Sequence, residues 1–311
     1  MGRLRSIAVG ATARVASLLL FGWRMAPRRL EVIHLLVRLP QLPQEWEGLR
    51  VAHLSDFHVG GRGVSLAMLR RAREVAERFH PDVIALTGDY YDNGQLSDSE
   101  GLFQHWPDDS EVVAVLGNHD DRGGDEHIEA VVSELQEAGV RVLRNQSTPI
   151  SLRGRTAWVV GVDDPYAWRM DDELAFGDVP DDEDVLLYLA HSPAAVSTMP
   201  VGRVGVLLSG HTHGGQIRIT PSGRIPFIGR LRQLRGAPLR NDPQVFHGVH
   251  RIRGAIVVIS NGLGVSQVPV RFRAAPHVIL IELATATDAD AASAACDDVA
   301  RYVTGRRFRA T

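Results

Sequence analysis

The chain has 311 residues, 44% of them hydrophobic, and a formal net charge of −3 at pH 7. This length is enough for one large α/β domain or two small ones, and the near-neutral charge gives no whole-chain case for nucleic-acid binding. The single cysteine, Cys296, excludes a disulfide framework within the chain and a thiolate zinc site, so any metal must be held by nitrogen and oxygen.

The first 45 residues differ from the rest. Residues 7–23, I-A-V-G-A-T-A-R-V-A-S-L-L-L-F-G-W, are mostly apolar, contain Arg14 and have further arginines on both sides. The stretch is shorter than the ~20 apolar residues of a spanning helix, and no A-x-A-like cleavage signal follows it. A helix in the membrane interface fits as well as a span, and a packed N-terminal helix is the alternative. We expect association with a membrane surface in an orientation that the flanking arginines leave open.

A proline-punctuated linker over residues 39–49 leads into a series of short apolar runs. The runs are rich in Val, Leu and Ile at successive positions, which is typical of strands buried on both faces of a sheet. Five runs end in polar side chains that can bind metals: Asp56 and His58, Asp89 and Asp92, Asn118 with His119 and Asp120, His191, and His211 with His213.

Helical patterns lie between several of these runs. Residues 65–79 have apolar positions at helical spacing after Ser65, a favourable N-cap, and residues 126–139 end on Gly139, a favourable C-cap. This alternation predicts an α/β fold with parallel pairing at its centre. Since side chains at the carboxyl ends of such strands collect at one edge of a sheet, the five polar groups can meet in space.

Further strand-like runs exceed what one central sheet needs. They cover residues 155–162, 215–220, 254–260 and 277–283. We therefore expect two packed mixed β-sheets flanked by helices. Residues 286–311 are rich in Ala and Asp and have a basic end, which predicts a loose tail or a short helix.

The metal-competent side chains form a ligand set of nitrogen and oxygen, which suits Mn, Fe, Zn or Co. The set is larger than one tetrahedral zinc needs, and it suits two ions roughly 3.5–4 Å apart that share a carboxylate. Two divalent ions and two aspartates leave a net positive charge, which suits a phosphate ester. Coordination also lowers the pKa of water to about 7, so hydroxide is available at neutral pH.

Five motifs follow one another in a distinctive order: D-F-H at 56–58, G-D-Y-Y-D at 88–92, G-N-H-D at 117–120, A-H-S at 190–192 and G-H-T-H at 210–213. In this respect the chain resembles the calcineurin-like metallophosphoesterases from about Leu49 to Leu283. The resemblance implies a four-layer sandwich of helices and two sheets that hydrolyses phosphoesters at two metal ions.

The chain also looks like a bacterial subgroup with an N-terminal membrane-targeting segment. The cues are L-P-Q-L-P-Q-E-W-E-G-L-R-V-A-H-L-S-D-F-H, V-G-V-D-D-P at 160–165, S-G-H-T-H-G-G-Q-I, and the late I-S-N-G-L-G-V-S and V-R-F-R. That subgroup includes enzymes acting on phosphodiester or pyrophosphate bonds of lipid-linked sugars. The likeness implies association with the bacterial cell membrane through residues 1–45, a catalytic domain over 46–285 and a tail over 286–311.

The family pattern, carried over position by position, gives each site residue a role. Asp89 would bridge the two metals, and the other ligands would be Asp56, His58 and His213 for the first metal and Asn118, His191 and His211 for the second. His119 would face the phosphate as electrostatic stabiliser or as general acid to the leaving oxygen, and Asp92 would orient its imidazole. We expect His211 and His213 to alternate in an extended segment that serves both metals.

The sequence thus predicts a phosphoesterase with two divalent ions (Mn, Fe or Zn) that cleaves phosphodiester or pyrophosphate bonds by in-line attack of a metal-bound hydroxide. Its expected partners are a phosphoester substrate, either lipid-linked or a nucleotide sugar, and a membrane surface. Specific nucleic-acid binding is not expected, and the sequence leaves the oligomeric state open. One alternative is a phosphomonoesterase or protein phosphatase, disfavoured because Asn93 stands where the protein phosphatases carry arginine. Another is a non-catalytic metal-binding interaction module, which would be free to lose ligands that are all present here.

Other polar residues are interpreted structurally. His53 lies within an apolar run, so we expect a packed or hydrogen-bonded core histidine. His277 stands where the subgroup usually has an acidic residue, and we expect it to be structural. Asp163 and Asp164 either approach the site from a later strand end or form a turn with Pro165; the sequence favours neither.

Overall fold

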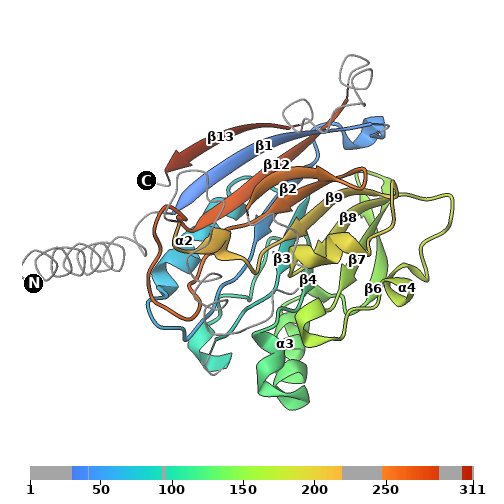
Figure 1. The fold of residues 1–311 in the computed structure, drawn as a ribbon. Helices are drawn as coiled ribbons and strands as arrows, with labels where there is room; N and C mark the ends of the chain where they lie inside the picture. Colours follow the sequence, from blue (N-terminus) through green and yellow to red (C-terminus); the bar gives the residue numbers. More distant parts are fainter. Residues whose placement is uncertain (1–29, 41, 93–95, 219–246, 287–302, 310–311) are drawn as a thin grey trace, which may run out of the picture.

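Two β-sheets packed against each other form the centre of the protein (Figure 1). The structure is a computed structural model, and it describes residues 30–40, 42–92, 96–218, 247–286 and 303–309. Within these residues one sheet has seven strands in the order β13-β1-β12-β2-β3-β4-β5, and the other has six in the order β10-β11-β9-β8-β7-β6. The predicted pair of mixed sheets with an α/β, metallophosphoesterase-like arrangement is therefore confirmed.

The seven-stranded sheet carries three of the five predicted strand ends. Its strands are β1 (Glu31–Leu39), β2 (Arg50–Leu54), β3 (Val83–Thr87), β4 (Glu111–Val115), β5 (Arg141–Val142), β12 (His277–Thr285) and β13 (Val303–Arg309). The pairs β2–β3, β3–β4 and β4–β5 are parallel, so the carboxyl ends of β2, β3 and β4 lie at one edge. The strand β12 runs antiparallel to β2 and parallel to β1.

The six-stranded sheet carries the other two strand ends. Its strands are β6 (Gln146–Leu152), β7 (Arg155–Val162), β8 (Val185–Ala190), β9 (Val204–Ser209), β10 (Gly248–Ile252) and β11 (Ala255–Ile259). The strands β7, β8, β9 and β11 are parallel, while β6 and β10 run antiparallel at the two edges. The carboxyl ends of β8 and β9 therefore also lie side by side.

Alternating side chains of the central strands fill two different layers of core. In β3, Val83 and Ala85 pack in the layer shared with the second sheet, whereas Ile84 and Leu86 face the opposite way. That outer layer is covered by α2 (Leu66–Glu77) and α3 (Asp125–Glu137), and the outer face of the second sheet by α4 (Asp172–Phe176). The short 3-10 helices are η2 (Gln44–Trp46), η3 (Leu96–Ser99), η4 (Asp120–Gly123), η5 (Pro165–Ala167), η6 (Pro193–Ser197) and η7 (His213–Gly215).

The predicted helix ends are confirmed. Ser65 caps α2 by accepting a hydrogen bond from the backbone N–H of Met68. Gly139 follows the end of α3 in the left-handed region, at φ 80°, where glycine avoids the Cβ clash of other residues. His53 is fully buried with its Nε2 2.8 Å from Thr87 Oγ1, as expected for a core histidine.

Three predicted boundaries differ from the structure. Glu31–Leu39, assigned above to the membrane segment and linker, forms β1: its backbone pairs with β12 and β13, and alternate side chains are buried. Residues 303–309, expected in a loose tail or short helix, form the edge strand β13. The strand expected over 215–220 is absent from its described part, residues 215–218, where the backbone makes only an isolated bridge from Ile217 to Phe272.

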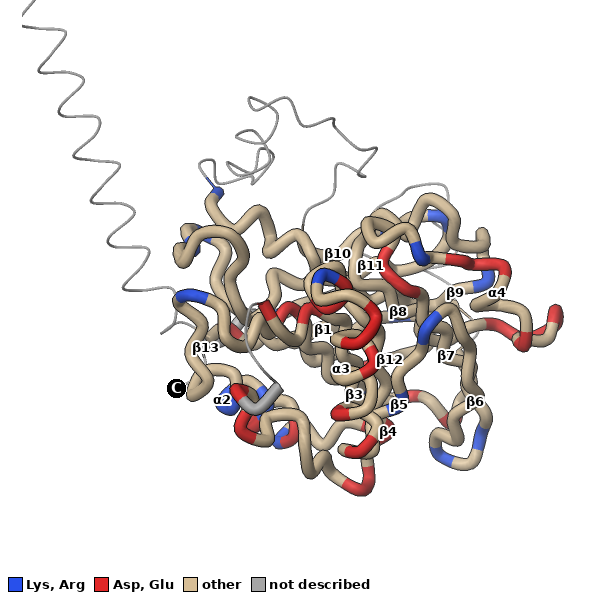
Figure 2. Tube along the Cα trace, turned by 90° about the horizontal axis from the view of Figure 1, so that it is seen from below, with Lys and Arg blue, Asp and Glu red and all other residues tan. Residues whose placement is uncertain are grey.

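The structure bears on membrane association through its described helices and surface charges. The apolar stretch 7–23 lies outside the described residues. Among the helices that the structure describes, none is both long and apolar enough to span a bilayer. Acidic residues follow one another closely on α4 and on the loop before β8 (Figure 2), where residues 181–184 are exposed. This acidic edge would disfavour contact with an anionic surface there.

Candidate metal centre

The five polar strand ends meet where the two sheets adjoin. Contacts between the sheets hold them together: the backbone N–H of His211, after β9, lies 3.0 Å from Asp56 Oδ1, after β2. His191, after β8, has its Nδ1 2.6 Å from the carbonyl oxygen of Thr87 at the end of β3. The predicted convergence of these strand ends therefore occurs in the folded chain.

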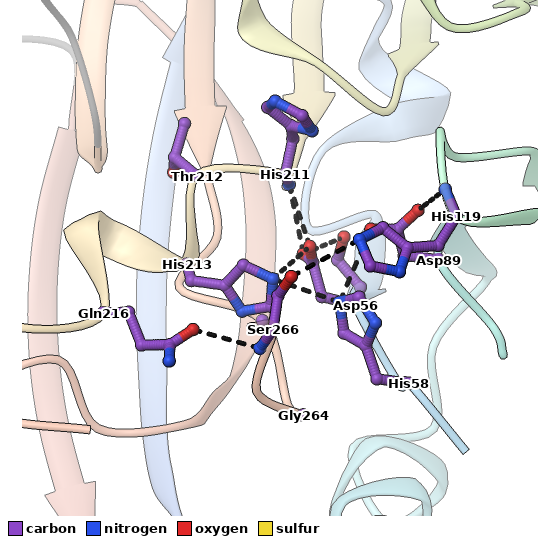
Figure 3. Close-up of polar contacts among 12 residues, drawn as sticks. Asp56, His58, Asp89, His119, His211, Thr212, His213, Gln216, Gly264 and Ser266 are labelled. Carbon is purple, nitrogen blue, oxygen red and sulfur yellow. Dashed lines mark hydrogen bonds and ion pairs between the residues drawn. The ribbon is translucent and has the colours of Figure 1, made fainter. Parts of the chain in front are cut away.

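One group of ligand atoms comes from Asp56, His58, Asp89 and His213, all of them buried. The Nε2 atoms of His58 and His213 are 3.1 Å apart, and His213 Nε2 is 3.4 Å from Asp56 Oδ1. In Figure 3 the His213 ring turns toward Asp56 and His58, while the His211 ring projects away from them. The residues predicted to hold the first metal thus surround one point.

A second group lies on the other side of Asp89. His211 Nδ1 is 2.7 Å from Asn118 Oδ1, and the rings of His191 and His211 have their centroids 5.1 Å apart. The Oδ2 atom of Asp89 is 3.2 Å from His191 Nε2 and 3.4 Å from His58 Nε2. One carboxylate oxygen therefore stands between the two groups, which is the placement that a bridging ligand requires.

His119 lies beside the first group and is held at both ring nitrogens. Its Nδ1 is 2.5 Å from Asp92 Oδ1, and its Nε2 is 3.3 Å from Ser266 Oγ. Its backbone N–H donates to Asp89 Oδ1 at 2.7 Å. Burial lowers the pKa of His119 to about 4, so the free ring is neutral at pH 7. The Asp92 contact is the one that the predicted orienting role requires.

The buried donor set fits divalent ions. The Nδ1 atom of His191 faces a carbonyl oxygen, so Nδ1 carries a proton. In the neutral ring the lone pair of Nε2 then faces the Asp89 carboxylate, and Nε2 makes no hydrogen bond. Although burial opposes it, the Asp89 carboxylate raises the pKa of His191, so a proton can join these two groups in the metal-free protein, and a divalent cation can take the place of that proton. Imidazole nitrogen with carboxylate and amide oxygen is a set that suits Mn, Fe or Zn.

His213 has a different arrangement at its second nitrogen. Arg271, itself buried, donates from Nη2 to His213 Nδ1 at 3.1 Å. A neutral imidazole has one proton, so His213 can offer the lone pair of Nε2 to a cation only if Nδ1 carries that proton and this hydrogen bond breaks. Burial lowers the pKa of both groups, that of Arg271 to about 9.

The loops that carry the ligands are tight turns. Asp56, His58 and Asp89 have φ values of 54°, 49° and 55°, and His211 and His213 have 65° and 50°. Asp and His adopt this left-handed region more readily than most residues. The expected extended segment is therefore wrong: Thr212 is helical at φ −80° and ψ −13°, and the turn sends the two histidine rings to opposite sides.

Two glycines let these turns approach one another. A Cβ atom at Gly117 would overlap the carboxylate of Asp89, and one at Gly210 would overlap that of Asp56. Each position therefore excludes a side chain, because the neighbouring carboxylate occupies the space. The glycines next to the ligands in the sequence thus serve close packing of the site.

Asp120, which the sequence indicates only as a side chain able to bind metal, supports the site through backbone contacts. Its Oδ2 accepts hydrogen bonds from the backbone N–H groups of Asp89 and Gly117, both at 2.8 Å, and its Oδ1 accepts one from Tyr90 at 2.8 Å. The side chain is fully buried. The loop after β3 is therefore fixed to the loop after β4 by one carboxylate, three residues after Gly117.

Asp120→Asn should destabilise the metal-free protein. An amide has one accepting oxygen, so whichever way it turns its NH₂ group faces a backbone N–H donor. Burial raises the pKa of Asp120 to about 7. Above that pH, where the carboxylate is charged, we expect the free energy of unfolding to fall by about 1.5–3 kcal/mol, the usual value of a hydrogen bond to a charged group. Urea denaturation of the stripped protein measures this. In Asp121→Asn, the adjacent control with a surface ion pair to Arg169, the loss should stay below about 1 kcal/mol. Equal losses in both variants would contradict the supporting role.

Known proteins share these features. A family model described as calcineurin-like phosphoesterase matches residues 49–215, more than half of the chain. The chain is 26% identical over 268 residues to the uncharacterized metallophosphoesterase YkuE of Bacillus subtilis, which covers 83% of this chain and 87% of that protein. It is 29% identical over 238 residues to phosphodiesterase YaeI of Escherichia coli, covering 75% and 82%.

A more distant relative spans more of the chain. The protein is 23% identical, over 335 aligned positions, to the UDP-2,3-diacylglucosamine pyrophosphatase LpxG of Chlamydia trachomatis, covering 88% of this chain and 98% of that protein. The family match includes the strand ends that bring Asp56, Asp89 and His191 together. The chain therefore belongs to the calcineurin-like phosphoesterase family and is a phosphoric ester hydrolase.

Proposed function

We propose that the protein hydrolyses phosphodiester or pyrophosphate bonds with two divalent ions. The observation that carries this proposal is the position of Asp89 Oδ2, 3.4 Å from His58 Nε2 and 3.2 Å from His191 Nε2. A carboxylate oxygen between two sets of imidazoles is the arrangement expected of a bridging ligand. A single-ion site would leave one of these sets, with its buried lone pairs, without a cation.

The ligands divide into two sets around Asp89. The first ion would be held by Asp56, His58 and His213, and the second by Asn118, His191 and His211. When bound, the ions supply Lewis acidity, which neutralises charge on the phosphoryl group and makes hydroxide available near neutral pH. The protein fixes the directions of the imidazoles, as the contact of His191 Nδ1 with Thr87 illustrates.

His119 acts on the substrate in this proposal. With Nδ1 held by Asp92, Nε2 would exchange its contact with the Ser266 hydroxyl for the phosphate or the leaving oxygen. Although burial keeps the free ring neutral, an anionic phosphate beside Nε2 favours the protonated form. The ring can then hold a proton at Nε2 and donate it to the departing oxygen, while Asp92 keeps the ring in position.

Lipid-linked diesters and pyrophosphates are the substrates that we favour. The chain is similar to a phosphodiesterase and to a pyrophosphatase that acts on a diacylated nucleotide sugar. The membrane-associated segment that the sequence predicts over residues 7–23 would bring the enzyme to such lipids. In the described part, Leu30 leads into β1, and the backbone of β1 pairs with β13, a strand whose sequence contains three arginines. A basic strand next to the N-terminal segment would favour an anionic membrane surface.

A phosphoester panel tests this function. The purified protein is reconstituted separately with Mn, Fe, Zn and Mg and is given bis-p-nitrophenyl phosphate, p-nitrophenyl phosphate and nucleotide-sugar lipids. We expect kcat/KM for the diester or the pyrophosphate lipid to exceed that for the monoester. A preference for the monoester would instead indicate a phosphomonoesterase. Two bound ions without hydrolysis of any substrate would indicate a binding module.

Removal of residues 1–29 should abolish membrane association and leave the hydrolytic activity intact. The truncation ends just before Leu30, which is buried, so β1 and the ligands remain. We expect a folded, metal-loaded domain with unchanged turnover of soluble diesters and reduced turnover of substrates in a bilayer. Each flanking arginine contributes about 1 kcal/mol near an anionic surface, so high salt should partly release the full-length protein from membranes.

Fractionation decides the outcome of the truncation experiment. Full-length protein that is wholly soluble at low salt would refute the membrane association. Failure of the truncated chain to fold would instead support a packed N-terminal helix. Resistance of the full-length protein to high salt would indicate a spanning segment.

A further inference from the structure

Asp164 is a buried carboxylate that faces the second group of ligands. It follows β7, and its side chain is only 2% exposed. Its Oδ1 accepts a hydrogen bond from the backbone N–H of Tyr166 at 2.7 Å, which caps η5. Its Oδ2 is buried and has no hydrogen-bond partner. The first oxygen thus has a structural role, and the second has none within the protein.

The surroundings of the Asp164 carboxylate are those of a cation site. Asp164, His191 and His211 each offer one ligand atom, and these atoms all lie within 4.8 Å of one another. The ring of Tyr166 stacks on His211, with centroids 4.6 Å apart and planes 16° apart, so the turn that positions Asp164 also orients a predicted ligand. The three residues come from the ends of β7, β8 and β9, which are neighbours in one sheet.

A buried carboxylate oxygen without a partner is costly in the metal-free protein. Its charge has lost the hydration of water, and no donor of the protein replaces that hydration. The nearby Nε2 of His191 also has no hydrogen-bond partner, although it faces Asp89. A cation between these acceptors would satisfy all of them at once. The sequence leaves open whether Asp164 approaches the site or only forms a turn, and the proximity of its carboxylate to His191 and His211 favours the first.

We propose that Asp164 is a further ligand of the second cation, which it holds through Oδ2 together with His191 and His211. This inference rests on the proposed two-ion function and adds a third carboxylate to Asp56 and Asp89. Two divalent ions and three carboxylates leave a formal charge of about +1 in place of about +2. The second ion is then held by more negative charge than Asn118 and two imidazoles supply alone.

Asp164→Asn separates this role from that of a cap. The asparagine oxygen can still accept the N–H of Tyr166, because Asn and Asp cap equally well, but the negative charge is removed. The neighbouring Asp163→Asn is the matched control. Asp163 is also buried, but its carboxylate pairs with Arg144 at 3.2 Å and lies outside the ligand groups. Both substitutions preserve size, and they differ in whether the lost charge faces the candidate site.

The experiment is a calorimetric titration of the full-length, chelator-stripped chain with Mn²⁺ or Zn²⁺. We expect two sites in the unmodified and Asp163→Asn proteins; in Asp164→Asn the affinity of one site should fall by about 10–100-fold while the other is unchanged. The melting temperature of stripped Asp164→Asn should equal or exceed that of the unmodified chain, because an unpaired buried charge has been removed. Its rise on adding metal should be smaller.

Several outcomes distinguish the possibilities. Two sites of unchanged affinity in Asp164→Asn would overturn the role of Asp164 as a ligand. A loss of stability in the stripped variant with no change in metal affinity would also overturn it, by showing a cap alone. Fewer than two ions in the unmodified protein would instead reject the two-ion function. The unmodified protein therefore tests the two-ion function, whereas Asp164→Asn tests the role of Asp164 as a ligand.

Discussion

Asp89→Asn is expected to remove more bound metal than any other single change of a ligand. Asp89 Oδ2 lies within 3.4 Å of nitrogen atoms from both groups, so both ions lose a charged ligand when the carboxylate becomes an amide. We expect less than one ion per chain to survive gel filtration, and hydrolysis of bis-p-nitrophenyl phosphate to fall near background. Metal analysis and kinetics on the same sample measure both effects.

The control for this variant lies at the other end of the same strand. Asp82 precedes β3 and pairs with Arg153 at 2.9 Å, away from the ligand groups. Asp82→Asn should therefore leave metal content and turnover unchanged, even if stability falls slightly. Two ions per chain in Asp89→Asn would show that this carboxylate does not bridge.

His119→Ala should have the second large effect, on chemistry instead of on metal binding. The ring lies next to the first ligand group, but its nitrogens face Asp92 and Ser266. We expect near-normal metal content and a loss of about 10²–10⁴-fold in kcat, the usual contribution of a general acid. If the ring donates a proton, esters with good leaving groups should suffer less. Asp92→Asn should give a milder form of the same defect.

Comparison with an exposed histidine makes this result specific. His80→Ala alters a residue before β3, far along the strand from the ligands, and should leave kcat unchanged. If His119→Ala loses metal in proportion to activity, His119 is a ligand and the assignment of its role is wrong. An equal loss for esters with good and poor leaving groups would point to electrostatic stabilisation and against proton donation.

The central strands and the convergence of the ligands could be predicted because their signals are local. In β3, for example, five successive buried residues lead directly to Asp89, and parallel neighbours place their carboxyl ends together. The strand β1 was missed because its pairing partners, β12 and β13, lie more than two hundred residues away in sequence. An alternating strand next to an apolar segment does not itself reveal which sheet it joins.

The details of the site depend on geometry that the sequence pattern does not specify. G-H-T-H predicted two ligands, but their direction depends on the turn at Thr212 and on the left-handed backbone of both histidines. The roles of Asp120 and Arg271 rest on contacts with other loops. The position of Asp120 could have indicated its role: it lies three residues after Gly117 at a strand end, where a short acidic side chain can accept hydrogen bonds from backbone N–H groups.

The most direct test of the account is a stepwise return of Mn²⁺ or Zn²⁺ to the stripped full-length protein, with bound metal and hydrolysis of bis-p-nitrophenyl phosphate measured at each step. Because Asp89 stands between two sets of imidazoles, we expect binding to saturate at two ions per chain and turnover to rise mainly with the second. Full turnover at one ion per chain, or hydrolysis by the stripped protein, would contradict a two-ion phosphoesterase.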